Sequence, residues 1–538
     1  CPCNSGKKFK KCHGALERPL AKPFPGPSQP EFEAMLRRAQ AKQVQRERQQ
    51  GRGRPIITLE QGEKRLVAVG TQLFSGPWKT FHDFLLHYLK ERMGRDWLAG
   101  EHAKPTGQRH LLLDWFDALQ REWEQSVIEP GGVLKAGRMT GGCHAVLSLA
   151  YDLYCIEHHG DGERDKAAFQ TLLTRLRHPE QFLGARHEAR VAGLLLRAGF
   201  TLTWEDEQVR QQGGHGEFVA TFPETGRAFW VECKMRQADD PEAKVRIGGL
   251  VSAALQKATD LERLVFVELC LANGELDEEL GGWTGQAINQ LRLLERDPAS
   301  DALPPALVIF TNFAERWQLD QPPEGWGAAM EGFKTDRYRL GEIEELQAAI
   351  AVRERDREIH LLWSSFQQHS RIPATFDGTL PGIDPERRLV FGQRYALPSG
   401  ERGVLEEATV VPEWKQAACF MRLDDGRRVM VQFDLSPAEL DAWKHHPDTF
   451  FGEVRPYHAP AKGPMDLYEF FLAGYADTPR ELLLEFMAHH TNIEELRTLP
   501  QPELAKRYAY ALAVSVAGQQ APQVPVWQQR LRKPKKPG

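Results

Sequence analysis

Four stretches between residues 81 and 200 repeat apolar side chains every three or four positions, the spacing that places them on one face of a helix. They are residues 81–93, 111–125, 143–159 and 182–200. The last stretch contains Gly199 near its end, and glycine is common just past a helix terminus. The pattern therefore predicts a series of amphipathic or buried helices.

Shorter apolar runs of strand character follow, and helical stretches separate the later ones. They cover residues 217–222, 228–235, 264–269 and 306–312. The turn Pro-Glu-Thr-Gly-Arg between the first two predicts an antiparallel hairpin. Strands alternating with helices favour an α/β (α+β) fold, with a central mixed sheet flanked by helices.

The length of 538 residues allows several domains. We expect a knuckle-like start (1–14), a Pro-rich linker with a basic helix (15–55), a helical region with a strand-like start (56–140), the α/β domain (141–340), and a C-terminal α+β region with a basic tail (341–538). The C-terminal region contains a β run with the hairpin turn Asp-Asp-Gly-Arg.

Composition narrows the class of protein without identifying a partner. The chain is 41% apolar and 27% charged, with a net charge of −5, which excludes a uniformly basic nucleic-acid coat but not a local basic surface. No run of about 18 apolar residues predicts a membrane span. Eight cysteines are too few for a disulfide scaffold, so we expect a reducing cytoplasmic location. Because the chain opens with Cys1, we expect a processed or truncated start.

Three cysteines and a histidine crowd the first fourteen residues: Cys1, Cys3, Cys12 and His13. Three thiolates and an imidazole are the ligand set of a closed tetrahedral Zn²⁺ site. A segment this short needs the metal to fold. With its Gly-Lys-Lys-Phe-Lys-Lys run, the segment resembles the SEC-C motif, a small zinc-binding module appended to many unrelated proteins. The resemblance implies a structural zinc ion and an accessory contact with nucleic acid or protein.

The strand 228–235 carries two charges inside an apolar run. Side chains alternate faces along a strand, so Glu232 and Lys234 share one face, while Phe229, Val231 and Cys233 share the other. A buried charge is costly unless it is paired or bound to a metal. The two charges therefore indicate a sheet edge or a functional site.

Two further acids can reach the same place. Glu217 heads the neighbouring strand, and Glu188 lies on the apolar stripe of helix 182–200. Close carboxylates repel each other unless a cation lies between them. Mg²⁺ or Mn²⁺, which prefers oxygen ligands, suits such a cluster.

A helix with Glu188, a strand headed by Glu217 and a Glu232-x-Lys234 strand resemble the PD-(D/E)XK nuclease superfamily. The resemblance covers about residues 140–320 and implies a restriction-endonuclease-like sheet. It also implies that Glu217 and Glu232 bind Mg²⁺ or Mn²⁺, Lys234 activates water, and Glu188 assists. The expected activity is metal-dependent hydrolysis of nucleic acid, with DNA as the first choice, and a homodimer is compatible with it.

Each candidate also has an ordinary structural interpretation. Glu232 and Lys234 fit an ion pair on an exposed sheet, Glu188 fits a pair with Arg186 or Arg190, and Glu217 fits a solvated turn. The alternative functions are a catalytically inactive nuclease-like binding or adaptor protein recruited through its SEC-C motif, and an adaptor that acts through its C-terminal half.

Weaker candidates surround these residues. Gln256, Lys257 and Asp260 follow the Glu-x-Lys strand, His215 could line the pocket, and Arg236, Lys244 and Arg246 could meet a phosphate. The cysteines and histidines of helix 143–159 follow the helix stripe. We expect packed cysteines and surface histidines there, with no second metal site.

Overall fold

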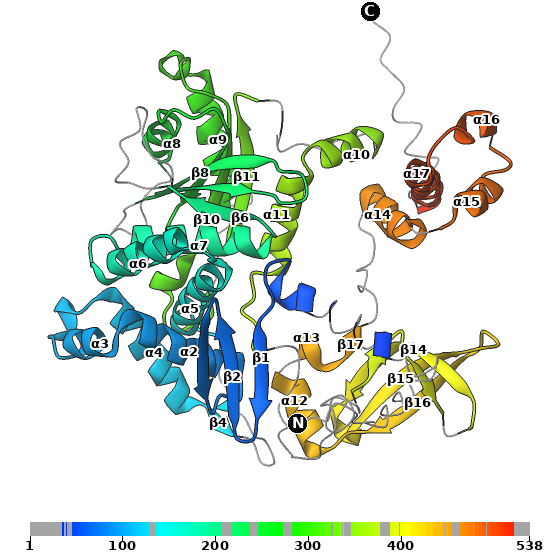
Figure 1. Cartoon of the computed structure of the whole chain (residues 1–538), viewed down its shortest axis with the longest axis horizontal. Coiled ribbons are helices and arrows are strands. Elements are labelled where there is room, and N and C mark those ends of the chain that lie inside the picture. Colours follow the sequence, from blue (N-terminus) through cyan, green and yellow to red (C-terminus); the bar gives the residue numbers. More distant parts are fainter. Residues whose placement is uncertain are drawn as a thin grey trace, which may run out of the picture. The chain divides into compact units, whose positions relative to one another are not determined.

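The computed structural model describes most of residues 46–520 (Figure 1). The described ranges are 35–36, 39, 43, 46–128, 135–136, 138–205, 217–236, 246–272, 282–323, 326–335, 337, 346–376, 388–397, 399–445, 447–453, 463–476, 478–490 and 492–520. The chain divides into two compact units. The smaller unit comprises Cys1–Glu47, Pro130–Val133 and Asp377–Arg455, and the larger comprises the rest. The expected α/β class is confirmed, because several sheets are flanked by helices.

A six-stranded mixed sheet forms the centre of the larger unit, in the order β11-β10-β9-β8-β7-β6. Its strands are β6 (Thr201–Trp204), β7 (Phe218–Thr221), β8 (Ala228–Met235), β9 (Glu262–Glu268), β10 (Ala306–Asn312) and β11 (Gly327–Phe333). Strands β8, β9 and β10 run parallel, and β7 pairs antiparallel with β8, as the hairpin prediction required. Glu232 therefore lies on an interior strand.

Helices cover both faces of this sheet. On one face, α5 (Gly141–His159) and α7 (Phe182–Arg197) share a core with Phe229, Val231 and Cys233 of β8. On the other, α8 (Gly248–Leu255) and α9 (Gly282–Arg296) pack on Val265 and Val308. Figure 1 shows α7 and α8 on opposite sides of the sheet. The apolar alternation along β8 thus matches the two faces that it separates.

Additional elements precede the sheet. A three-stranded sheet is followed by helices that join the same core, with a short strand pair before α5. These elements are β1 (Ile57–Gln61), β2 (Lys64–Val69), β3 (Gln72–Gly76), α2 (Phe81–Met93), α3 (Arg95–His102), α4 (Leu111–Gln125), β4 (Val127–Ile128), β5 (Lys135–Ala136) and α6 (Glu163–Arg177).

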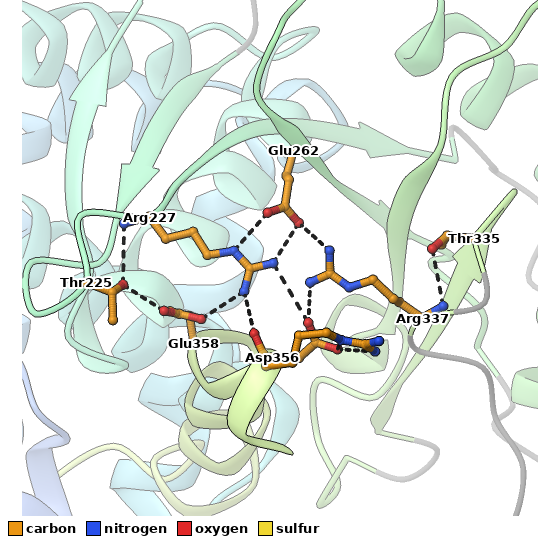
Figure 2. A network of polar contacts seen from close by, with 8 residues as sticks. Thr225, Arg227, Glu262, Thr335, Arg337, Asp356 and Glu358 are labelled. Atoms are coloured by element: carbon orange, nitrogen blue, oxygen red, sulfur yellow. Dashed lines mark hydrogen bonds and ion pairs between the residues drawn. The ribbon is translucent and has the colours of Figure 1, made fainter. Parts of the chain in front are cut away.

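An ion network anchors the start of β8. Figure 2 shows Arg227, beside the β7–β8 turn, between Glu262 of β9 and Glu358 of α11 (Arg357–Gln368). Arg227 donates to Glu262 Oε2 at 2.8 Å and to Glu358 Oε2 at 3.0 Å, while Arg337 adds a contact to Glu262 at 3.1 Å. The turn itself needs Gly226, whose φ is +70°. This network fixes the strand that presents Glu232.

The C-terminal helices of the larger unit are α14 (Pro464–Tyr475), α15 (Arg480–Phe486), α16 (Ile493–Leu496) and α17 (Gln501–Gln520). They meet α10 (Leu346–Arg355) through Lys506, which contacts Glu354 at 2.8 Å. Among the described residues, no helix is both long and apolar enough to cross a membrane.

The smaller unit is built on a four-stranded antiparallel sheet with its own apolar core. Its elements are β12 (Val390–Phe391), β13 (Arg394–Ala396), β14 (Arg402–Val411), β15 (Gln416–Leu423), β16 (Arg428–Asp434), α12 (Pro437–His445), α13 (Pro447–Phe450) and β17 (Gly452–Glu453). The Asp-Asp-Gly-Arg turn joins β15 to β16, as expected.

Candidate functional site

Glu232 is fully buried in the middle of β8, yet only one of its two carboxylate oxygens has a partner. Oε1 accepts hydrogen bonds from Lys234 Nζ at 2.5 Å and from Lys257 Nζ at 2.6 Å. Oε2 is buried and accepts none. A buried polar atom without a partner costs free energy, which is unusual in a core strand. The unpaired oxygen therefore distinguishes Glu232 from an ordinary core residue.

The two lysines approach Glu232 from different elements. Lys234 lies two residues along the same strand face, whereas Lys257 follows the end of α8. Their side chains keep 24% and 27% of their surface exposed, so both ammonium groups remain within reach of solvent. The interpretation of Glu232 and Lys234 as an ion pair on an exposed sheet is wrong for the glutamate, which is wholly covered.

Glu188 lies on α7 and is held by a neighbouring helix. Arg175 of α6 donates to both of its oxygens, at 2.5 Å each. The expected partners are not those of the structure, because Arg186 contacts Asp152 and Arg190 contacts Glu315. The Arg175 pairing depends on the packing of α6 against α7, which sequence spacing does not reveal.

Glu217 is the third acid. It continues the β7–β8 pairing, since its N–H donates to the Val231 carbonyl at 3.1 Å. Burial and then the negative charges of Glu188 and Glu232, partly offset by Arg175 and Lys257, together raise the pKa of Glu217 to about 8. A carboxyl group whose pKa lies near neutrality is common at functional sites.

Cys233, on the face of β8 that packs against α7, is affected by the same three acids. Its pKa is raised first by burial and then by Glu217, Glu188 and Glu232. Three carboxylates thus act on one another, and three cations (Arg175, Lys234 and Lys257) lie among them. We call these six residues (Glu188, Glu217, Glu232, Arg175, Lys234 and Lys257) the carboxylate cluster.

Within the described part of the chain, no three Asp, Glu, His or Cys side chains are arranged as ligands of one metal ion. In the carboxylate cluster, Arg175 occupies both oxygens of Glu188, and the lysines occupy Oε1 of Glu232. The unpaired Oε2 of Glu232 and the oxygen-only acid set nevertheless fit a hard divalent cation.

Two cluster residues were not assigned roles from the sequence. Lys257 was among three candidates after the Glu-x-Lys strand, and only the fold singles it out from Gln256 and Asp260. Nothing in the sequence indicated a role for Arg175, since an arginine in the last turn of a helix is an ordinary surface residue.

Several predicted residues lie elsewhere or outside the described residues. Cys1, Cys3, Cys12, His13, His215 and Lys244 are outside them. Arg236 is buried and its Nε donates to the Leu269 carbonyl at 2.8 Å, whereas Arg246 is exposed just before α8.

A second group of buried charges lies between α5 and α7. Asp152 pairs with Arg186 at 2.7 Å and with Arg197 at 2.9 Å, and Glu315 pairs with Arg190 at 2.6 Å. We call these five residues the arginine network. His144 lies 3.1 Å from Glu315. The expectation of surface histidines on this helix is wrong for His144 and His158, which are both buried. Trp326, just before β11, packs against His144, and His158 hydrogen-bonds with the Pro55 carbonyl before β1.

Comparison with known proteins gives one match. The SEC-C motif matches residues 1–15, the segment that carries Cys1, Cys3, Cys12 and His13. No curated protein and no solved structure matches the chain. The chain therefore carries a SEC-C motif at residues 1–15. The fold and the candidate site of the described residues rest on the structure alone.

Proposed function

We propose that this protein is a metal-dependent nuclease of the PD-(D/E)XK type that hydrolyses phosphodiester bonds of DNA at the carboxylate cluster. One observation carries the proposal. Glu232 is fully buried on an interior strand, holds two lysines on Oε1, and leaves Oε2 without a partner. A purely structural glutamate at this position would gain from pairing both oxygens.

Each residue of the cluster has a role in this proposal. Glu217 and Glu232 would hold Mg²⁺ or Mn²⁺, which lowers the pKa of water and neutralises charge on the phosphate. Lys234, whose side chain keeps 24% of its surface exposed, would orient the attacking water and accept its proton when uncharged. Lys257 would place positive charge beside the phosphate oxygens, where negative charge develops during attack.

Arg175 and Glu188 supply the remaining parts. Because Arg175 occupies both oxygens of Glu188, Glu188 would assist the cation only after this guanidinium turns away. Arg175 has 27% of its side chain exposed, so it can turn towards solvent or towards a phosphate of the substrate. Arginine is well suited to exchange a carboxylate for a phosphate, since both match its planar fork.

The SEC-C segment would add a structural zinc ion. Cys1, Cys3, Cys12 and His13 form a donor set that suits tetrahedral Zn²⁺. Its lysines would give the accessory contact with nucleic acid or with a protein partner. Zinc content by mass spectrometry should be one ion per chain, and Cys12→Ala should remove it.

The test is cleavage of supercoiled plasmid with Mg²⁺ or Mn²⁺, with a single-stranded RNA in parallel. The wild type should nick the plasmid, EDTA should stop it, and Glu232→Gln should slow it by at least about 10²-fold. Glu331→Gln is the matched control, because Glu331 is also fully buried on the sheet and contacts Arg292 at 2.8 Å. Equal cleavage by wild type and Glu232→Gln would contradict the assignment.

One observation favours the inactive alternative. Three cations already face the three acids, so the cluster is balanced without a metal. A nuclease-like binding or adaptor protein recruited through its SEC-C motif would keep this balance. It would bind nucleic acid or protein without any metal-dependent cleavage, and the plasmid assay separates the two functions.

A further inference from the structure

A cavity of about 300 Å³ opens between α5, α7, α11 and the start of β11. Each helical residue advances by about 100°, so Arg190, Leu194 and Arg197, which line the cavity, lie roughly 180–240° around α7 from Glu188. The cavity is therefore on the opposite side of this helix from the carboxylate cluster. Its volume falls at the lower end of the range of about 300–1,000 Å³ that holds small ligands.

Aromatic rings form the walls. Trp363 and Phe366 of α11 lie almost parallel, at 11° with centroids 6.0 Å apart. Phe313 and Trp326 meet edge to face at 5.6 Å, and Tyr151 adds a fifth ring to the lining. Walls of this kind bind planar rings by stacking, which is how proteins hold unpaired bases.

Two polar atoms in the wall lack partners. His144 Nε2 and Trp326 Nε1 are buried without a hydrogen bond. Burial lowers the pKa of His144, and Arg190 and His144 hold the pKa of Glu315 well below its usual range. A neutral His144 therefore donates Nδ1–H to the ionised Glu315, which leaves Nε2 as an acceptor. Two residues of the wall thus carry one unpaired acceptor and one unpaired donor.

The charges beneath the cavity argue against a cationic ligand. Three guanidinium groups of the arginine network meet two carboxylates. Arg190 also lies over the Phe313 ring at 3.8 Å, so this ring face is already occupied by a cation. An aromatic cage for a quaternary ammonium would need the opposite charge balance.

We propose that this cavity binds a nucleobase, with the ring stacked on Trp363 and Phe366 and its edge paired with His144 Nε2 and Trp326 Nε1. The edge of a base presents donors and acceptors side by side, which matches the two unpaired atoms. The base can belong to a free nucleoside or to an unstacked nucleotide of a strand. The proposal does not depend on the activity of the carboxylate cluster.

The experiment is calorimetric titration of the full chain in EDTA, so that no cleavage occurs. The probes are the free nucleosides of the four DNA bases, a ten-nucleotide single strand, and the same strand with abasic sites. If a nucleoside binds, the ligand of the cavity is a free nucleoside. If only the base-containing strand binds, the ligand is an unstacked nucleotide of a single strand. Trp363→Leu should weaken either by at least tenfold, and Trp326→Phe, which keeps an aromatic side chain but loses Nε1–H, should weaken it severalfold.

The control is Trp414→Leu, which changes a tryptophan that is 63% exposed in the smaller unit and should leave binding unchanged. Circular dichroism and thermal melting establish that each variant is folded. Absence of binding by every base-containing probe would overturn the proposal. It would also be overturned if the abasic strand bound as tightly as the base-containing one, or if Trp363→Leu left binding unchanged.

Discussion

Buried carboxylates are paired differently on the two sides of α7. In the arginine network, each carboxylate meets guanidinium groups, and the pKa of Glu315 is held well below its usual range by Arg190 and His144. In the carboxylate cluster, Glu232 keeps an unpaired oxygen, and the pKa of Glu217 rises to about 8.

The difference separates two uses of the same residue types. A buried carboxylate with both oxygens paired, as in Asp152 and Glu315, fixes the packing of the elements around it. Acids that repel one another destabilise the fold and persist where they serve a function. The comparison predicts that substitutions in the cluster lower cleavage, and that substitutions in the network lower stability.

The largest effect is expected at Lys234. Lys234→Met removes the group that would act on the attacking water while keeping the length of the side chain. Cleavage should fall by about 10²–10⁴-fold, the usual contribution of general acid–base catalysis, while Lys257 still pairs with Glu232 and the variant stays folded. Single-turnover cleavage of a labelled duplex measures it. A drop in stability with unchanged cleavage would place Lys234 with the structural ion pairs.

Next in size is the loss of Glu315 from the arginine network. Glu315→Ala leaves Arg190 buried without its carboxylate, which should cost about 3–5 kcal/mol of unfolding free energy. Urea denaturation monitored by fluorescence measures it. Glu163→Ala is the control, since this residue is 91% exposed in its pair with Lys166 and should not change the midpoint. If Glu315→Ala and Glu163→Ala had the same urea denaturation midpoint, the arginine network would stabilise the fold no more than an exposed ion pair does.

Glu217 predicts a stability change that depends on pH. Its folded pKa of about 8 exceeds the ordinary value of 4.5, so the native state keeps a proton that the unfolded chain loses in this window. The free energy of unfolding attributable to Glu217 therefore falls as the pH rises from about 5 to 8. In EDTA, Glu217→Gln should raise the melting temperature at pH 8 by about 2 °C or more, and change it little at pH 5. The same change at both values would show that Glu217 ionises normally.

The sequence supported the hairpin, the helices around it and the alternation of β8, because these follow from local periodicity. It also selected Glu188, Glu217, Glu232 and Lys234 as one group, since a charge on a core stripe is visible without a structure. It did not supply Arg175 or choose Lys257, because both contacts depend on how separate helices pack. The surface assignment of His144 failed for the same reason, as Trp326, just before β11, covers this ring with centroids 4.1 Å apart.

The central claim is that Glu217 and Glu232 together hold a divalent cation. Titration of the zinc-loaded full chain with Mn²⁺, followed by electron paramagnetic resonance, measures it directly. The account predicts bound Mn²⁺ in the wild type that disappears in the Glu217→Gln/Glu232→Gln double variant and persists in Glu331→Gln. Identical Mn²⁺ binding by the wild type and the double variant, or none in the wild type, would contradict it.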